Sequence, residues 1–98
     1  MVMDFDLKDN DFLRQFEIDV DGNLAKIEYS LQERKIFLTK IIIPEAIEDN
    51  NFEDIFIKEV FTNIDDRNLK VVPTSPTIAK FIRKNKQYKQ LLPVGIKI

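Results

Sequence analysis

The fold of this chain is decided by residues 16–31, which read FEIDVDGNLAKIEYSL. Hydrophobic and polar residues alternate on both sides of Asp21-Gly22, and a period of two is typical of strands with one buried face. Asp-Gly is a strong signal for a two-residue turn, because both residues accept the left-handed conformation that this turn requires. The stretch therefore predicts a β-hairpin.

Further strands are expected after the hairpin. A polar turn at residues 32–34 leads to a third alternating run, residues 35–43, which ends at Pro44. Residues 69–72 form a short hydrophobic run of the kind buried inside a sheet, and Pro73 ends it. The pattern predicts an antiparallel β-meander whose third strand is joined to the fourth by a right-handed crossover.

Two other segments have the period of helices. Hydrophobic residues recur at helical spacing over residues 52–64, and Asn50 with Glu53 resembles a capping box. Ser75 followed by Pro76 is typical of a helix start. The predicted order is β-β-β-α-β-α, an α+β (α/β) fold in which the meander is followed by a β-α-β crossover and a C-terminal helix.

The 98 residues suffice for one domain. We expect a flexible N-terminus over the polar residues 1–11 and a single domain over 12–98, with residues 91–98 as an edge strand or a docked extension. No hydrophobic run approaches the ~20 residues that span a bilayer, and no signal peptide is visible. A cytoplasmic protein without membrane contact is therefore expected.

Missing residue types exclude many chemistries. The chain has no Cys and no His, which excludes disulfides, thiolate nucleophiles, zinc fingers and His-dependent hydrolases, and no metal site is expected. Its two glycines, Gly22 and Gly95, are too few for a P-loop or a Rossmann phosphate loop.

Residues 17–28 place carboxylates at a spacing close to that of a calcium loop, with Glu17, Asp19, Asp21 and Glu28. An EF-hand needs a helix on each side of its loop, whereas strands are predicted here. We therefore favour the hairpin over a calcium site.

Charge is separated along the chain. Residues 1–66 carry 7 basic and 17 acidic residues, a net charge of −10, whereas residues 67–98 carry 8 basic and no acidic residues, a net charge of +8. The basic run from Lys80 to Lys89 could contact phosphates, with Tyr88 stacking on a base. A solvated helix face explains the same residues more simply, so nucleic-acid binding is a minor alternative.

Two segments resemble a known family. Residues 16–25, FEIDVDGNLA, are similar to the opening hairpin of the small single-domain GNAT-like N-acetyltransferases (the YjdJ type). Residues 69–76, LKVVPTSP, followed by Phe81-Ile82-Arg83 and Tyr88, resemble the C-terminal motif of the same family. The resemblance covers about residues 12–92. It implies a GNAT-like fold, acetyl-CoA as cofactor and an amine as acceptor.

The resemblance also implies where acetyl-CoA would bind. The pantetheine arm would insert as a pseudo-strand where the third strand splays from the fourth, and the pyrophosphate would lie on a glycine-containing loop led by Arg or Gln. The matching positions are Ile41, Ile42, Ile43, Asp49, Asn50, Asn51, Phe52, Glu53 and Asp54. Glu48 stands at the leading position, and Asp49, Asn51 and Glu53 replace glycines. Side chains and carboxylates there would repel a diphosphate, so we expect a degraded site.

Candidate catalytic residues follow from the same resemblance. Ser75 corresponds to the family's Cys, and Lys40 and Asn85 correspond to two family His residues. Ser75 has no His to activate it and is explained as a helix cap. GNAT-type transfer needs no protein nucleophile, because the amine attacks the thioester directly, and either a carboxylate such as Glu45 or a chain of water molecules would accept the proton.

Three functions remain open. The favoured one is a degenerate GNAT-fold domain with weak or lost acetyl-CoA binding that serves an unidentified protein partner. The first alternative is an active acetyl-CoA-dependent N-acetyltransferase that acts on a primary amine. The second is weak nucleic-acid binding through the basic C-terminal helix.

Overall fold

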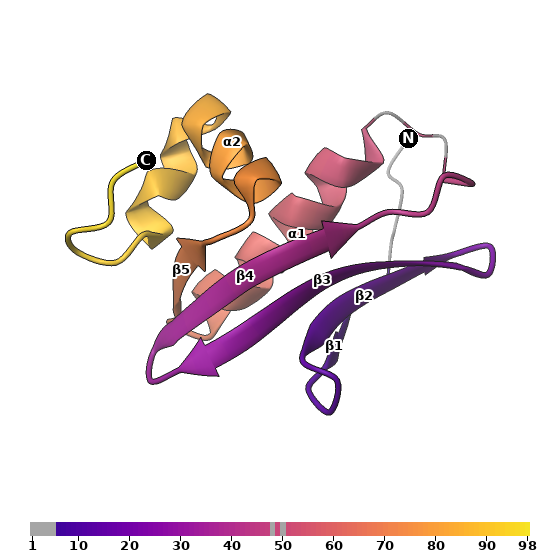
Figure 1. Ribbon diagram of the computed structural model, residues 1–98, viewed down its shortest axis with the longest axis horizontal. Coiled ribbons are helices and arrows are strands. Elements are labelled where there is room, and N and C mark those ends of the chain that lie inside the picture. The colour runs from indigo at the N-terminus through magenta and orange to yellow at the C-terminus, as the bar shows by residue number, and fades with distance from the viewer. Residues whose placement is uncertain (1–5, 48, 50) are drawn as a thin grey trace.

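The computed structural model describes residues 6–47, 49 and 51–98. Its elements in chain order are β1 (Lys8–Asn10), β2 (Gln15–Val20), β3 (Asn23–Gln32), β4 (Lys35–Ile42), α1 (Phe52–Asp66), β5 (Lys70–Pro73), α2 (Pro76–Lys84) and a 3₁₀ segment η1 (Lys86–Leu91). One sheet has the strand order β1-β2-β3-β4-β5, in which β4 and β5 are parallel and the other neighbours are antiparallel (Figure 1). The predicted α+β fold, a meander followed by a crossover and a C-terminal helix, is confirmed.

The turn between β2 and β3 is the predicted one. Asp21 and Gly22 have φ angles of 53° and 84°, as a type I′ turn requires, and Val20 pairs with Asn23 across it. Asp19 Oδ1 accepts a hydrogen bond from the Gly22 backbone N–H at 2.7 Å. The carboxylates that resembled a calcium loop therefore lie on a strand-turn-strand unit.

The sheet begins before residue 12, where the sequence analysis placed the start of the domain. Residues 8–10 form β1 and pair with β2, so the assignment of residues 1–11 to a flexible N-terminus is wrong for this part; residues 1–5 lie outside the described residues. Tyr29 on β3 donates a hydrogen bond to Asp9, and Arg67 contacts the other Asp9 oxygen at 2.9 Å. A three-residue polar strand has no hydrophobic alternation, so periodicity does not predict it.

The core lies between one face of the sheet and α1, which runs across that face (Figure 1). The buried strand residues alternate as predicted, and α1 contributes a stripe at helical spacing. This core includes Phe16, Ile18, Ala25, Ile27, Tyr29, Ile36, Leu38, Val71, Phe52, Phe56, Val60 and Ile64. Leu31 continues the hydrophobic alternation of β3 but is 36% exposed, because it lies near the tip of the β3–β4 hairpin.

Both helices begin close to their predicted starts. The N-cap of α1 is Asn51, and Asn50, the predicted cap, lies outside the described residues. Ser75 is the N-cap of α2 and Pro76 its first residue, as predicted. Residues 91–98 form a docked extension rather than an edge strand: Leu91 is buried, and Ile98 packs against the core.

Across the described residues, no helix has the length and hydrophobicity needed to cross a bilayer.

Candidate functional site

The parallel pair β4–β5 separates at Leu38. The last paired residues are Leu38 and Pro73, and the Leu38 carbonyl then accepts hydrogen bonds from the Ser75 backbone N–H and the Thr74 hydroxyl, both at 3.0 Å. These two bonds end the β5 pairing and start α2. In the described part of the chain, no strand pairs with β4 on this side from Thr39 to Ile42. The backbone groups of this edge are therefore open to an extended ligand.

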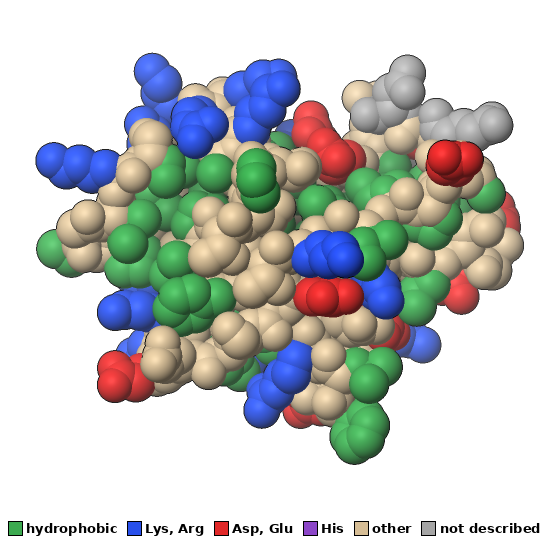
Figure 2. Space-filling view, viewed as in Figure 1, with side chains coloured by type: hydrophobic (Ala, Val, Ile, Leu, Met, Phe, Trp, Pro, Cys, Tyr) green, Lys and Arg blue, Asp and Glu red, His purple; other side chains and the backbone are tan. Residues whose placement is uncertain are grey.

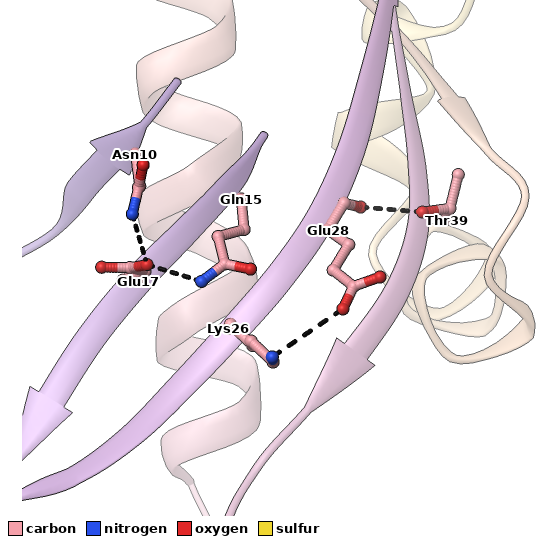
Figure 3. Close-up of polar contacts among 6 residues, drawn as sticks. All are labelled: Asn10, Gln15, Glu17, Lys26, Glu28 and Thr39. Carbon is pink, nitrogen blue, oxygen red and sulfur yellow. Dashed lines mark hydrogen bonds and ion pairs between the residues drawn. The ribbon is translucent and has the colours of Figure 1, made fainter. Parts of the chain in front are cut away.

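A β-bulge lies at the same point of β4. Tyr29 pairs with Leu38 and Glu28 pairs with Lys40, so Thr39 is the extra residue. The Thr39 hydroxyl donates a hydrogen bond to the Glu28 carbonyl at 3.2 Å, which holds the bulge closed (Figure 3). The splay between β4 and β5 thus begins at a structural irregularity of β4.

The bulge changes which residues of β4 face the core. Before it Ile36 and Leu38 are buried, and after it Ile41 and Ile43 pack against the core, whereas Lys40 is exposed. A one-residue shift exchanges the two faces of a strand, so the bulge keeps Lys40 out of the core. The expected pantetheine residues 41–43 are half-buried at the open edge, although Ile43 lies just past the end of β4.

In the loop before α1, backbone N–H groups already donate hydrogen bonds to Asp49. Asp49 Oδ1 accepts from the Asn51 backbone N–H at 2.8 Å, and the Asp49 carbonyl accepts from the Phe52 N–H at 3.0 Å. Asn51 has a φ of −92°, so this residue makes no glycine-like turn. A phosphate held by such a loop needs free backbone N–H groups. Asp49 already occupies two of them.

Carboxylates also surround this end of α1. Glu53 and Asp54 lie in the first turn and are exposed. They complement the helix dipole, as an anionic ligand would, and they repel such a ligand. The described residues of this loop thus present carboxylates, and the Asn51 and Phe52 N–H groups are already bonded, whereas the edge of β4 has no strand partner on the β5 side from Thr39 to Ile42 among the described residues. Glu48 and Asn50 lie outside the described residues.

A pocket of about 280 Å³ opens between this first turn and one face of α2. Its lining joins acidic residues of α1 with basic residues of α2: Glu53, Asp54, Thr77, Lys80, Phe81, Lys84 and Asn85. Figure 2 shows basic side chains gathered over α2 and the C-terminal segment, with acidic side chains beside them. The side chain of Asn85 is not free, because it caps the end of α2 by donating to the Phe81 carbonyl at 2.9 Å.

The two catalytic candidates lie in different segments of the fold. Ser75 lies where β4 and β5 separate and is 3% exposed, and its side chain makes no capping hydrogen bond. Glu45 lies in an exposed turn after the C-terminal end of β4. Ser75 therefore lies part-way along β4, where β5 separates from it, whereas Glu45 lies past the C-terminal end of β4.

The other face of the sheet is polar. Glu17 accepts hydrogen bonds from Asn10 at 3.0 Å and Gln15 at 2.6 Å, and Lys26 forms an ion pair with Glu28 at 3.9 Å (Figure 3). The carboxylates of Glu17 and Glu28 thus have separate partners. Among the described residues, no group of Asp or Glu side chains is arranged to hold a metal ion.

Tyr88 is unsuited to stacking on a nucleic-acid base. Its ring lies edge-on to Phe61 with centroids 5.2 Å apart and is tilted against Phe81 at 5.6 Å. The ring is half-buried in this aromatic cluster. The basic face of α2 therefore lacks the free aromatic side chain that single-strand binding surfaces use.

The sequence model of the GCN5-related N-acetyl-transferase family matches residues 15–91. The match spans most of the chain, including both segments that resembled this family. The chain therefore belongs to the GCN5-related N-acetyl-transferase family. Enzymes of this family in general use acetyl-CoA and an acceptor substrate. A search of curated proteins found no match to this chain.

Sequence reasoning missed three features of the site. The bulge at Thr39 breaks the alternation only once, and the hydroxyl of Thr74 bonds to a residue 36 positions away. Thr77 lines the pocket but belongs to no recognised motif. The only available signal was the run IFLTKIII over residues 36–43, where strict alternation would put Lys40 among hydrophobic residues.

Proposed function

We propose that this chain is a degenerate GNAT-fold domain, in which acetyl-CoA binding is weak or lost and the remaining role is to bind a protein partner. The observation that carries the proposal is the loop before α1. There Asp49 accepts hydrogen bonds from the Asn51 and Phe52 N–H groups, and Glu53 and Asp54 add two further negative charges. A diphosphate would have to displace one carboxylate and approach two more.

One observation favours a second candidate, an active N-acetyltransferase acting on a primary amine. The edge of β4 from Thr39 to Ile42 stays open, and an extended pantetheine arm needs only the backbone groups of that edge. Acetyl-CoA would supply the acetyl thioester, and this chain would position it at the point where β4 leaves β5. The acceptor amine would attack without a protein nucleophile.

Calorimetric titration with acetyl-CoA and CoA, at low and moderate salt, separates the two candidates. The degenerate domain should show a dissociation constant of about 1 mM or no binding. Micromolar binding at both salts would contradict the proposal and favour the enzyme, and a screen of primary amines would follow.

Restoring glycines to the loop tests the cause of the weak binding. We expect Asp49→Gly, Asn51→Gly and Glu53→Gly together to strengthen CoA binding by about tenfold or more, because they free the backbone N–H of residue 51 from the Asp49 carboxylate and remove two negative charges. Isothermal calorimetry measures the gain. Glycine at position 53 costs α1 about 1 kcal/mol, so a thermal melt must confirm that the variant is folded.

A matched control removes the same charge elsewhere. Asp65→Asn with Asp66→Asn takes two negative charges from the C-terminal end of α1 and leaves the loop intact. It should change CoA affinity less than twofold. A folded glycine variant with no gain would show that the loop is not what weakens binding.

A further inference from the structure

The pocket between α1 and α2 has a basic wall. Thr77, Lys80 and Lys84 follow one another at positions i, i+3 and i+7 of α2, a spacing that aligns side chains along one helix face. This face is opposite the first turn of α1 across the pocket. A hydroxyl and two ammonium groups in a row make a set of donors that suits an anion with several oxygen atoms.

Lys80 and Lys84 form no ion pair with other described residues. The ion pairs within the described residues join Lys26 to Glu28 and Arg67 to Asp9, and neither includes Lys80 or Lys84. Both lysines are exposed, although Glu53 and Asp54 line the same pocket. Ile78 and Ile82 of α2 pack in the core and do not line the pocket, and neither lysine belongs to the core, so folding does not require a charge at either position.

The size of the pocket limits what it can hold. Pockets for whole drug-sized ligands occupy about 300–1,000 Å³, and this one has about 280 Å³. A phosphate group with its sugar is smaller than a drug-sized ligand, so this volume can hold it. The pocket borders α1 at its first turn, which follows the open edge of β4 by way of residues 43–51.

We propose that Lys80 and Lys84, assisted by the Thr77 hydroxyl, bind a phosphate group of the nucleotide half of CoA, and that α2 thereby replaces the loop before α1 as the phosphate anchor. The inference rests on the proposed function in the form in which CoA binding is weak but present. Glu53 and Asp54 oppose the lysines across the pocket, and their repulsion of the phosphate limits the affinity.

The test is an NMR titration of the full ¹⁵N-labelled chain with CoA, dephospho-CoA and pantetheine. We expect Lys80→Gln with Lys84→Gln to weaken CoA binding by about tenfold or more, since each lysine loses a charge-assisted contact. Pantetheine binding should be unchanged. Loss of the lysine effect with dephospho-CoA identifies the 3′-phosphate as the bound group, whereas its persistence identifies the diphosphate.

A matched control separates a local site from overall charge. Arg83→Gln with Lys86→Gln removes the same two positive charges from exposed residues that do not line the pocket, and it should change CoA affinity less than twofold. Conversely, Glu53→Gln with Asp54→Asn should strengthen CoA binding several-fold.

The inference would be overturned if the Lys80→Gln, Lys84→Gln variant and the control variant weakened CoA binding equally. It would also be overturned if the Lys80→Gln, Lys84→Gln variant bound CoA as tightly as the wild type. Absence of CoA binding by the wild-type chain would overturn it as well, while leaving the degenerate function standing. Micromolar CoA binding that requires Lys80 and Lys84 would uphold the inference and contradict the degenerate function.

Discussion

Tyr29 connects three parts of the protein through one side chain. It is 4% exposed, its ring lies 4.9 Å from that of Phe16, and its hydroxyl donates to Asp9 on β1. The second oxygen of Asp9 accepts from Arg67, just past the end of α1. Burial, together with the hydrogen bond and the negative charge of Asp9, raises the pKa of Tyr29 to about 12. The protonated phenol is thus part of the folded state.

Replacing Tyr29 with Phe should reveal this contribution. At pH 7 we expect Tyr29→Phe to lower the free energy of unfolding by about 1 kcal/mol, the typical value of one hydrogen bond. Because the folded-state pKa is raised, this stabilisation is complete below pH 10 and is lost as the pH rises through 12. The difference between wild type and variant, measured by urea unfolding, should therefore shrink above pH 10.

The Tyr88→Phe variant provides the control. The chain has two tyrosines, so this variant leaves Tyr29 as the sole phenol. Its ultraviolet absorbance should titrate with a midpoint of about 12. A midpoint at the ordinary value of 10 would show that in solution Tyr29 is neither buried nor in contact with Asp9.

At the scale of elements, α2 divides its two faces between stability and binding. Ile78 and Ile82 are fully buried, and Phe81 packs edge-on against Phe61 of α1 with centroids 5.7 Å apart. Lys80 and Lys84 line the pocket instead. The same nine-residue helix therefore closes the core and offers a charged surface.

This division predicts that neighbouring substitutions change the free energy of unfolding by very different amounts. Ile82→Ala should lower the free energy of unfolding by about 2–5 kcal/mol, because it removes buried methyl groups and leaves a cavity. Arg83→Ala, one residue further on the exposed side, should change it by no more than about 0.5 kcal/mol. Chemical denaturation of both variants checks the contrast, and similar losses in the two would show that α2 is not docked as described.

Elements with a strong period could be predicted, and irregular ones could not. The hairpin at Asp21-Gly22 and the start of α2 at Ser75-Pro76 depend on local conformational preferences, so both were found. The strand β1 and the bulge at Thr39 depend on what lies beside them in the sheet. A three-residue polar segment has no sequence pattern that predicts pairing with a neighbouring strand.

At the scale of the molecule, folding turns the charge separation along the chain into a local one. The acidic residues 1–66 and the basic residues 67–98 meet where the first turn of α1 faces α2. The small net charge of −2 therefore does not indicate that acidic and basic side chains line the same pocket. Binding there should depend on salt concentration more than the net charge suggests.

Truncation tests where the domain begins. Removing residues 1–11 deletes β1 and leaves Tyr29 and Arg67 without Asp9. We expect the free energy of unfolding to fall by about 2 kcal/mol or more, measured by urea unfolding. Asp9→Ala alone should cost less, because the backbone pairing of β1 remains. An unchanged stability in the truncated chain would mean that the domain begins at residue 12 after all.

The sequence by itself determined the order of the elements from β2 to α2, the hairpin turn, the start of α2 and the family, because these depend on periods and local motifs. It also predicted Ile41–Ile43, Ser75 and the acidic loop before α1 as candidate site residues. Only the tertiary structure decided that β4 stays open beyond Leu38, that Asp49 occupies the loop's N–H groups and that Lys80 and Lys84 face Glu53 and Asp54. These features join residues from separate elements, and packing alone brings such residues together.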